Sequence, residues 1–191
     1  MNEPRRRYHY TYADYVALES VSAEKHEFLD GEIYVMAGGS ENHSKLGVNT
    51  VALLHGIVKE PCYVHGSDLR IYVESVGLAT FPDASVICGP LQQHEPSPDA
   101  TALNPTILVE VTSDSSEEYD TETKLECYRT IPTLREYVIV SHRERRITVH
   151  VRESDDTWST RVSKGASVEL PSLHAQLSLD EIYRGTTISA D

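Results

Sequence analysis

The 191-residue sequence has no long apolar run and no excess of basic charge, and each absence excludes a class of protein. No stretch approaches the roughly 18 apolar residues that a membrane-spanning helix needs. The amino-terminal segment MNEPRRRYHY carries arginines with no apolar segment behind them, which is not the pattern of an export signal. We therefore expect a soluble, cytoplasmic protein with no membrane partner.

Cysteine is also scarce. The three cysteines, Cys62, Cys88 and Cys127, are odd in number, lie far apart in the chain and form no C-x-x-C pair. Disulfide frameworks and zinc sites usually show an even count or a paired spacing. Because thiols stay reduced in the cytoplasm, we predict three buried, reduced cysteines rather than a disulfide or a zinc site.

The motifs of several common enzyme classes are missing. The sequence has no G-x-S-x-G turn of a serine hydrolase and no G-x-x-x-x-G-K-[ST] phosphate loop. Its nine histidines form no H-E-x-x-H pattern and no Cys/His cluster, so most of them are interpreted as surface or half-buried residues. These absences leave chemistry based on carboxylates as the main alternative.

Positive charge is in short supply, with 17 Lys and Arg against 30 Asp and Glu, a net charge of −13. A basic footprint is the usual sign of a nucleic-acid-binding protein, so this balance opposes tight DNA binding. Clustered acids could instead hold a divalent cation, which inverts the local field. The only basic clusters are 5–7 and the arginines at 143, 145 and 146, which are either solvated or contact phosphates.

The hydrophobic pattern predicts a mixed α/β chain with a central sheet. Helices are expected at 12–20, 46–58, 118–129 and, as one or two turns, 179–183. A hairpin with an Asp-Gly turn is expected at 28–36. Further strands are expected at 69–73, 83–88, 106–112, 135–140, 146–151 and 158–163. The segment 89–105 is rich in Pro, Ser and Gln and is predicted to be a surface loop. No linker is visible, so we expect one domain over residues 1–191 with a core of about 12–184.

Two acids stand out because they lie in apolar segments. Asp83 follows Pro82 at the start of a strand, and Glu110 lies inside the run TILVEVT. A carboxylate in a buried strand is costly to desolvate unless it is paired or binds a cation. Glu110 in particular therefore needs a partner.

Lys124 is the candidate partner, because it lies on the helix that follows the strand. Asp120, Lys124 and Tyr128 are spaced by four residues and share one helical face. An exposed ion pair of Lys124 with Asp120 would be worth only a few tenths of a kcal/mol. Together with two strand acids, however, the lysine indicates a site for Mg²⁺ or Mn²⁺, in which carboxylates bind the metal and the ammonium orients or deprotonates a water.

Several segments resemble a known family. KHEFLDGEIYVMAGGSENHSKL, FPDASVI, LVEVTSDSSEEYDTETKLECY and LREYVIV are similar to the bacterial Uma-two endonucleases of the PD-(D/E)XK, restriction-endonuclease-like superfamily. The resemblance covers about residues 12–184. It implies a restriction-endonuclease-like fold, in which a twisted mixed sheet is flanked by helices. By resemblance Asp83 and Glu110 are metal ligands, and Glu27, Asp83, Glu110 and Lys124 form the catalytic group.

The resemblance also matches His43, at the start of the second helix, to a substrate-binding position. Two departures are visible. The superfamily lysine stands two residues after the strand acid, where this chain has Thr112, so Lys124 would be a migrated lysine. The segment after the strand reads Ser113-Asp114-Ser115-Ser116 where relatives usually have S-P-S-T, which adds an acid near the site.

We therefore predict a magnesium- or manganese-dependent endonuclease that hydrolyses DNA, with arginines of a homodimer supplying a local groove for the DNA. Two alternatives stay open. The chain is a binding or assembly module that keeps the fold without catalysis, or it is a metal-dependent phosphoesterase acting on RNA or a small phosphate ester. The intact Asp83, Glu110 and Lys124 oppose the first alternative. The net charge of −13 mildly favours both alternatives over a protein that binds DNA tightly.

Overall fold

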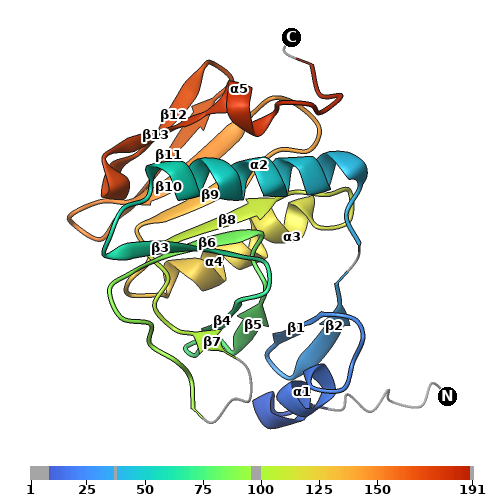
Figure 1. Ribbon diagram of the computed structural model, residues 1–191. Coiled ribbons are helices and arrows are strands. Elements are labelled where there is room, and N and C mark those ends of the chain that lie inside the picture. Colours follow the sequence, from blue (N-terminus) through green and yellow to red (C-terminus); the bar gives the residue numbers. More distant parts are fainter. Residues whose placement is uncertain (1–8, 37, 96–99, 190–191) are drawn as a thin grey trace, which may run out of the picture.

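The computed structural model describes residues 9–36, 38–95 and 100–189, which form two large sheets, a two-stranded ribbon and five α-helices (Figure 1). One sheet has five strands and the other has six. Among the described residues, no helix combines the length and the apolar character needed to cross a membrane.

The five-stranded sheet contains the amino-terminal part of the chain. Its order is β2-β1-β5-β4-β7. Its strands are β1 (His26–Leu29), β2 (Glu32–Val35), β4 (Arg70–Val73), β5 (Leu78–Thr80) and β7 (Thr101–Ala102). The predicted hairpin is confirmed, with Asp30 and Gly31 at φ 45° and 87°, as a two-residue turn of primed type requires. Helix α1 (Tyr12–Glu19) packs on β1 through Tyr15, beside Phe28.

The six-stranded sheet is the mixed central sheet that the sequence predicts. Its order is β11-β10-β9-β8-β6-β3, and only β8 and β9 run parallel. Its strands are β3 (Cys62–Gly66), β6 (Ala84–Cys88), β8 (Ile107–Val111), β9 (Glu136–Val140), β10 (Ile147–Arg152) and β11 (Trp158–Ser163). Strand β8 is buried along its whole length, as expected for an apolar run in the middle of a sheet.

Helices cover both faces of this sheet (Figure 1). On one face lie α2 (Glu41–Ile57), the ribbon of β12 (Ser167–Leu170) and β13 (Ala175–Ser178), a 3-10 turn (Pro171–Leu173) and α5 (Leu179–Ile182). On the other face lie α3 (Glu117–Thr121) and α4 (Thr123–Arg129), together with apolar residues of the five-stranded sheet. The end of β8 therefore meets α2 from one side and α3–α4 from the other.

The helix predicted at 118–129 is interrupted. It is divided at Glu122, whose φ and ψ are −117° and −72°. The hydroxyl of Thr121 donates to the carbonyl oxygen of Glu117 at 2.7 Å, a contact that competes with the helix ladder and bends helices. The spacing of Asp120 and Lys124 survives the interruption, because their charged atoms still lie 3.1 Å apart.

Two other predictions are wrong in part. The segment 89–105 is not only a surface loop, because Thr101 and Ala102 form β7, which pairs with β4, and both residues are fully buried. A strand of two residues is too short to produce a periodic pattern. Cys62 and Cys88 form a disulfide, whereas Cys127 is free and buried as predicted.

The disulfide follows from the strand pairing. Cys62 on β3 and Cys88 on β6 stand directly opposite each other in the antiparallel register, although 26 residues separate them in the chain. The sequence pattern predicts β6 but indicates no strand at 62–66. Without that strand, the two thiols could not be placed together.

Candidate functional site

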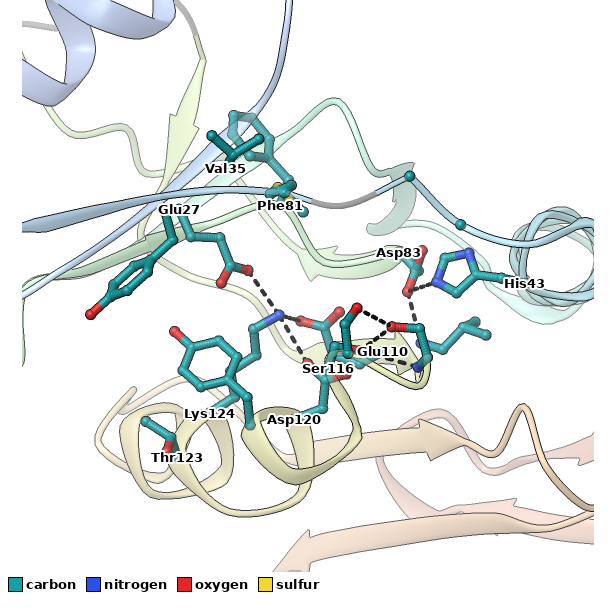
Figure 2. A pocket seen from close by; sticks show the side chains of 18 of the residues that line it. Glu27, Val35, His43, Phe81, Asp83, Glu110, Ser116, Asp120, Thr123 and Lys124 are labelled. Carbon is teal, nitrogen blue, oxygen red and sulfur yellow. Dashed lines mark hydrogen bonds and ion pairs between the residues drawn. The ribbon is translucent and has the colours of Figure 1, made fainter.

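The ammonium of Lys124 is the centre of a buried cluster of carboxylates (Figure 2). Its Nζ lies 2.9 Å from Oε1 of Glu27, 3.0 Å from Oε1 of Glu110 and 3.1 Å from Oδ1 of Asp120. The Lys124 residue is only 4% exposed. The lysine face of the helix therefore meets the sheets and not the solvent.

Each partner of Lys124 comes from a different element. Glu27 is on β1, Glu110 on β8 and Asp120 on α3, while Lys124 itself is in the first turn of α4. The hydroxyl of Thr80, on the neighbouring β5, donates to Glu27. The cluster thus joins the five-stranded sheet, the six-stranded sheet and the helices that lie between them.

Glu110 has two donors on the same oxygen. The hydroxyl of Tyr128 donates to Oε1 at 2.8 Å, and Lys124 donates to that atom at 3.0 Å. Tyr128 is one helical turn after Lys124, so the predicted Asp-Lys-Tyr face points at Glu110. Tyr128 was not among the predicted site residues, although the D-x-x-x-K-x-x-x-Y spacing could have identified it.

Asp83 lies apart from this cluster, where the chain enters β6. Its Oδ2 accepts from the backbone N–H of Val111 at 2.7 Å and lies 3.7 Å from Nε2 of His43 (Figure 2). His43 is in the first turn of α2, whose N-cap Ser40 accepts from the His43 N–H. A side chain at Gly39 would overlap the His43 ring, so the glycine gives the ring its space.

All five predicted site residues line one cavity of about 550 Å³. The structure thus brings together Glu27, His43, Asp83, Glu110 and Lys124, although they come from five separate segments of the chain. Asp83 and Glu110 both line this cavity, so their side chains face a common space. In the described part of the chain, however, no ion pair joins Asp83 to Lys124.

Burial governs the protonation of the two proposed metal ligands. Desolvation raises the pKa of Asp83, although His43 and the Val111 N–H oppose it. Desolvation also raises the pKa of Glu110 well above its usual value, and the Lys124 ammonium opposes this shift. Repulsion from Asp83 is a smaller contribution to the Glu110 shift. Desolvation, and not repulsion between the two acids, is therefore the main cause of both pKa shifts.

Lys124 stays charged in this environment. Burial alone would lower its pKa, but the carboxylates of Glu110, Glu27 and Asp120 outweigh that effect and hold the pKa well above the usual value. An ammonium in this state donates hydrogen bonds and cannot accept a proton. Of the two roles that the sequence suggests, orienting a water fits the three donor contacts that the ammonium makes to carboxylates.

The donor set of the cavity fits a hard divalent cation. Among the described residues, four carboxylates line the cavity (Glu27, Asp83, Glu110 and Asp120), against the single ammonium of Lys124. Oδ1 of Asp120 is buried and makes no hydrogen bond, with only the ion pair to Lys124 as a partner. Uncompensated negative charge at this depth calls for protons or for a further cation.

The carboxylates of the cavity fit a metal ion that keeps several water ligands. In the part of the chain that the structure describes, no group of three or more His, Cys, Asp or Glu side chains is gathered to hold a metal. Mg²⁺ commonly binds proteins through one or two carboxylates and retains several waters. Asp83 and Glu110 are suited to that mode, since both line the cavity.

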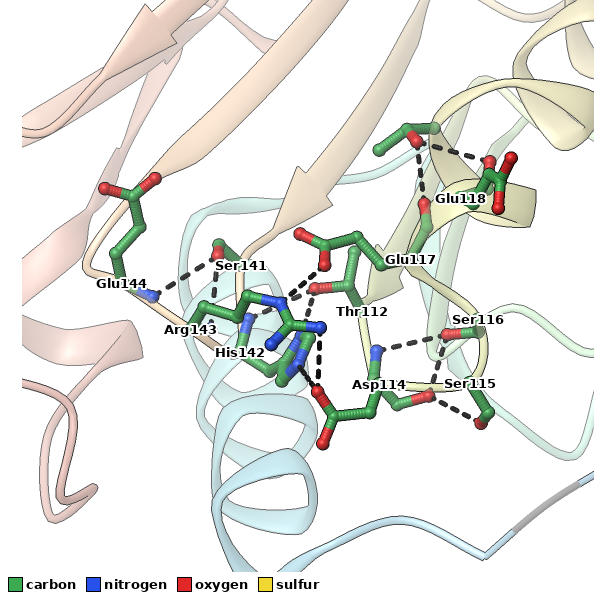
Figure 3. A network of polar contacts seen from close by, with 12 residues as sticks. Thr112, Asp114, Ser115, Ser116, Glu117, Glu118, Ser141, His142, Arg143 and Glu144 are labelled. Carbon is green, nitrogen blue, oxygen red and sulfur yellow. Dashed lines mark hydrogen bonds and ion pairs between the residues drawn. The ribbon is translucent and has the colours of Figure 1, made fainter.

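A second polar network fixes the segment after β8 (Figure 3). Thr112, which occupies the superfamily lysine position, bonds Nδ1 of His142 at 2.8 Å. Asp114 contacts Nε2 of His142 at 3.2 Å and Nη2 of Arg143 at 2.8 Å. Arg143 also donates to Glu117 at 2.6 Å. This network fixes the position of three serines that line the cavity, Ser113, Ser115 and Ser116.

The basic clusters do not form an open phosphate-binding surface in the described chain. Arg143 is paired as above, Arg145 bonds Asp180 at 2.6 Å, and Arg146 contacts Glu144 at 3.1 Å. The other cluster, 5–7, lies outside the described residues. The arginines at 143, 145 and 146 are therefore paired with carboxylates, which neither the solvated nor the phosphate-contacting interpretation anticipated.

Comparison with known proteins agrees with the fold. The profile of the Uma2 family, described as "Putative restriction endonuclease", matches residues 12–181. An uncharacterized protein of Synechocystis sp., slr1290, is 33% identical over 174 residues, covering 90% of both chains. A second one, sll1609, is 32% identical over 161 residues, covering 84% of this chain and 90% of its own.

A solved structure supports the same fold. A crystal structure from Anabaena variabilis, described as a "putative nuclease belonging to DUF820", matches with a TM-score of 0.68 and 20% identity, over 88% of this chain and 96% of that chain. At this level of identity the match supports the fold alone. The predicted restriction-endonuclease-like fold is confirmed.

Proposed function

The chain belongs to the Uma2 family, and on this premise we propose that it is a divalent-metal-dependent endonuclease that hydrolyses DNA phosphodiester bonds. Family membership supports a nuclease-like function. The observation that carries the finer proposal is the single cavity in which Asp83, Glu110 and Lys124 meet, with more carboxylates than cations among its described residues. Such a site suits a metal ion and a phosphate better than it suits a neutral substrate.

Asp83 and Glu110 are the proposed metal ligands. The Val111 N–H and His43 orient Asp83, while Tyr128 and Lys124 orient Glu110. When bound, Mg²⁺ or Mn²⁺ supplies positive charge to the phosphate and lowers the pKa of a coordinated water. The protein contributes fixed oxygens at the edge of a rigid sheet, which limits the reorganisation needed to bind the ion.

Lys124 positions the attacking water in this proposal. Its ammonium has three N–H donors and lies beside Glu110. If one donor leaves its carboxylate partner, that N–H can donate to a water in the cavity. Glu27 holds the other side of the ammonium, at 2.9 Å, and is itself fixed by Thr80. Glu27 thus acts through Lys124 as a positioning residue.

His43 is the proposed contact to the substrate phosphate on the α2 side of the cavity. We place the activity in the bacterial cytoplasm and allow a homodimer to contribute arginines to the DNA-binding surface. The relatives are bacterial proteins, whereas the Cys62–Cys88 disulfide is unusual for the reducing cytoplasm. The ion pairs of the described arginines mean that a dimer would have to reorganise them.

A cleavage assay with matched variants tests the proposed function. Supercoiled plasmid, single-stranded DNA and RNA are incubated with the protein in Mg²⁺, in Mn²⁺ and in EDTA. Asp83→Asn and Glu110→Gln remove the proposed ligands. Glu136→Gln is the control, because Glu136 is also a buried strand carboxylate but bonds Ser172 outside the cavity.

We expect the wild type and Glu136→Gln to cut DNA with either metal and not in EDTA, and both ligand variants to be inactive. Cleavage by Asp83→Asn or Glu110→Gln at the rate of Glu136→Gln would contradict the assignment of the ligands. Cleavage of RNA alone would move the substrate to RNA. Absence of cleavage on every nucleic acid would contradict the proposed nuclease activity itself.

A further inference from the structure

One wall of the cavity is apolar and is built on the same hairpin that supplies Glu27. Tyr34 on β2 stands directly opposite Glu27 on β1 in the antiparallel register. Side chains at directly opposed positions lie on the same face, within about 4.5–5.5 Å at Cβ. Leu29, two residues after Glu27, points to that face as well. Tyr34 and Leu29 therefore border the cavity next to the lysine cluster.

The apolar wall extends to the mouth of the cavity. Tyr34 is 47% exposed and Val35 is 61% exposed, although both line the cavity. Phe81 lies deeper, beside Val35, and Figure 2 shows both on the opposite side of the cavity from Asp120 and Lys124. A phosphate and a metal need the polar floor, but neither needs an aromatic wall beside it.

The charges around the cavity do not match a DNA duplex. Among the described residues that line the cavity, Lys124 is the only lysine or arginine, and three carboxylates already surround it. Binding to duplex DNA depends largely on cations that neutralise phosphates of both strands. Binding of single-stranded nucleic acid adds stacking of bases on aromatic side chains to the contacts with phosphates, so an aromatic wall favours an unpaired strand over a duplex.

The size of the cavity agrees with a single nucleotide. Its volume of about 550 Å³ falls in the range of roughly 300–1,000 Å³ that accommodates small-molecule ligands. A base can enter such a cavity only when it is unpaired and unstacked, as in enzymes that extrude a nucleotide. The acidic floor and the aromatic wall would then contact the phosphate and the base of one nucleotide.

We propose that this wall stacks an unpaired nucleobase next to the scissile phosphate, with Tyr34 as the main platform, so that the substrate class is single-stranded DNA or an unpaired stretch within a duplex. The inference rests on the proposed nuclease function and specifies its substrate. Tyr34 is a binding residue in this proposal, and its role needs the ring and not the hydroxyl, which donates to Glu32.

The test compares matched oligonucleotides with Tyr34 variants. A labelled 30-nucleotide strand is offered alone, in a perfect duplex, and in a duplex with a five-nucleotide unpaired bulge, with Mn²⁺ present. Binding of the same strands is measured by fluorescence anisotropy in Ca²⁺, a divalent ion that also takes oxygen ligands, so that the acidic floor carries a cation. The variants are Tyr34→Ala and Tyr34→Phe. Tyr63→Ala is the control, because Tyr63 is an exposed tyrosine on β3 that does not line the cavity.

We expect the single strand to be cut at least about ten times faster than the duplex, and the bulged duplex to be cut at its bulge. Tyr34→Ala should weaken single-strand binding by about 5- to 150-fold, the loss expected for one stacked base. Tyr34→Phe and Tyr63→Ala should bind like the wild type. Equal cutting of duplex and single strand, or unchanged binding by Tyr34→Ala, would overturn the inference.

The two proposals fail in different ways. Single-strand binding that depends on Tyr34, without cleavage of any substrate, would support the inference and contradict the nuclease function. Metal-dependent cutting of the perfect duplex that is insensitive to Tyr34→Ala would support the nuclease function and overturn the inference. Absence of both binding and cleavage would overturn both.

Discussion

At the scale of single residues, the cavity is a problem of charge balance. The described cavity wall holds Glu27, Asp83, Glu110 and Asp120 with one ammonium between them. Removing a partner from a buried ion pair leaves a charge that is costly to desolvate, whereas replacing a charge by a neutral isostere can be harmless. Variants of Glu110 and Lys124 should therefore behave differently.

Glu110→Gln should leave the fold at least as stable as the wild type in EDTA. The amide oxygen can still accept from Tyr128 and Lys124, while one of the buried negative charges is removed. The melting temperature in EDTA, measured by circular dichroism, tests this expectation. A fall of several degrees would instead show that the ion pair with Lys124 is mainly structural.

Lys124→Ala should slow the chemical step by about 10²-fold or more, because the attacking water loses the group that positions it. It should also lower the stability in EDTA, because three carboxylates lose their shared cation. Single-turnover cleavage rates and urea unfolding measure the two effects. Turnover close to that of the wild type would remove Lys124 from the mechanism.

Glu136 offers a pH test outside the cavity. Burial raises its pKa, against hydrogen bonds from Ser172 and the charges of Arg161 and Arg135. The folded state then holds the proton more tightly than the unfolded chain does. This contribution to stability is present below the ordinary carboxyl pKa of about 4.3 and is lost as pH rises through the raised folded value.

Glu136→Gln removes the loss of stability that ionisation of Glu136 causes as the pH rises. The variant should gain stability relative to the wild type between pH 4 and pH 8, because the amide does not titrate and can keep both contacts with Ser172. Urea unfolding at the two pH values measures the difference. A difference in unfolding free energy that is constant, or that shrinks toward pH 8, would contradict the assignment.

At the scale of elements, the disulfide fixes the edge strand β3 to β6. The bond closes a segment of 26 residues, for which loop-closure entropy predicts a stabilisation of about 3–4 kcal/mol. Reduction should lower the unfolding free energy of the wild type by up to that amount. It should leave the unfolding free energy of the double variant Cys62→Ser/Cys88→Ser unchanged. Thiol titration in denaturant should detect one thiol before reduction and three after it. Three thiols in the untreated protein would contradict the pairing.

The elements also show what sequence reasoning can and cannot supply. The apolar run of β8 and the helical spacing of Asp120, Lys124 and Tyr128 are local patterns, so they placed the right faces toward the core. Thr80 reaches Glu27 through the pairing of β5 with β1, which are distant in the chain, and such pairing leaves no local signal. The place of Tyr34 opposite Glu27, in contrast, follows from the two-residue Asp-Gly turn of the predicted hairpin. The pairing of β3 with β6 also leaves no local signal, so the sequence could not predict that Cys62 and Cys88 lie opposite each other.

At the scale of the whole molecule, the net charge of −13 is compatible with a nuclease if the site itself carries the cation. The described arginines after β9 are paired with carboxylates and add little attraction for a phosphate backbone. A bound divalent ion offsets two of the negative charges that line the cavity. In the proposed function, attraction of the substrate phosphate therefore depends on metal binding more than on surface charge.

Calorimetric titration of the metal-free protein with Mn²⁺ tests that dependence most directly. We predict one Mn²⁺ bound per chain in the wild type and in Glu136→Gln, and retained binding in Lys124→Ala, because an ammonium is not a ligand. Asp83→Asn and Glu110→Gln should each lose the site. Binding that is unchanged in both ligand variants, or absent from the wild type, would contradict the central claim that Asp83 and Glu110 hold the ion.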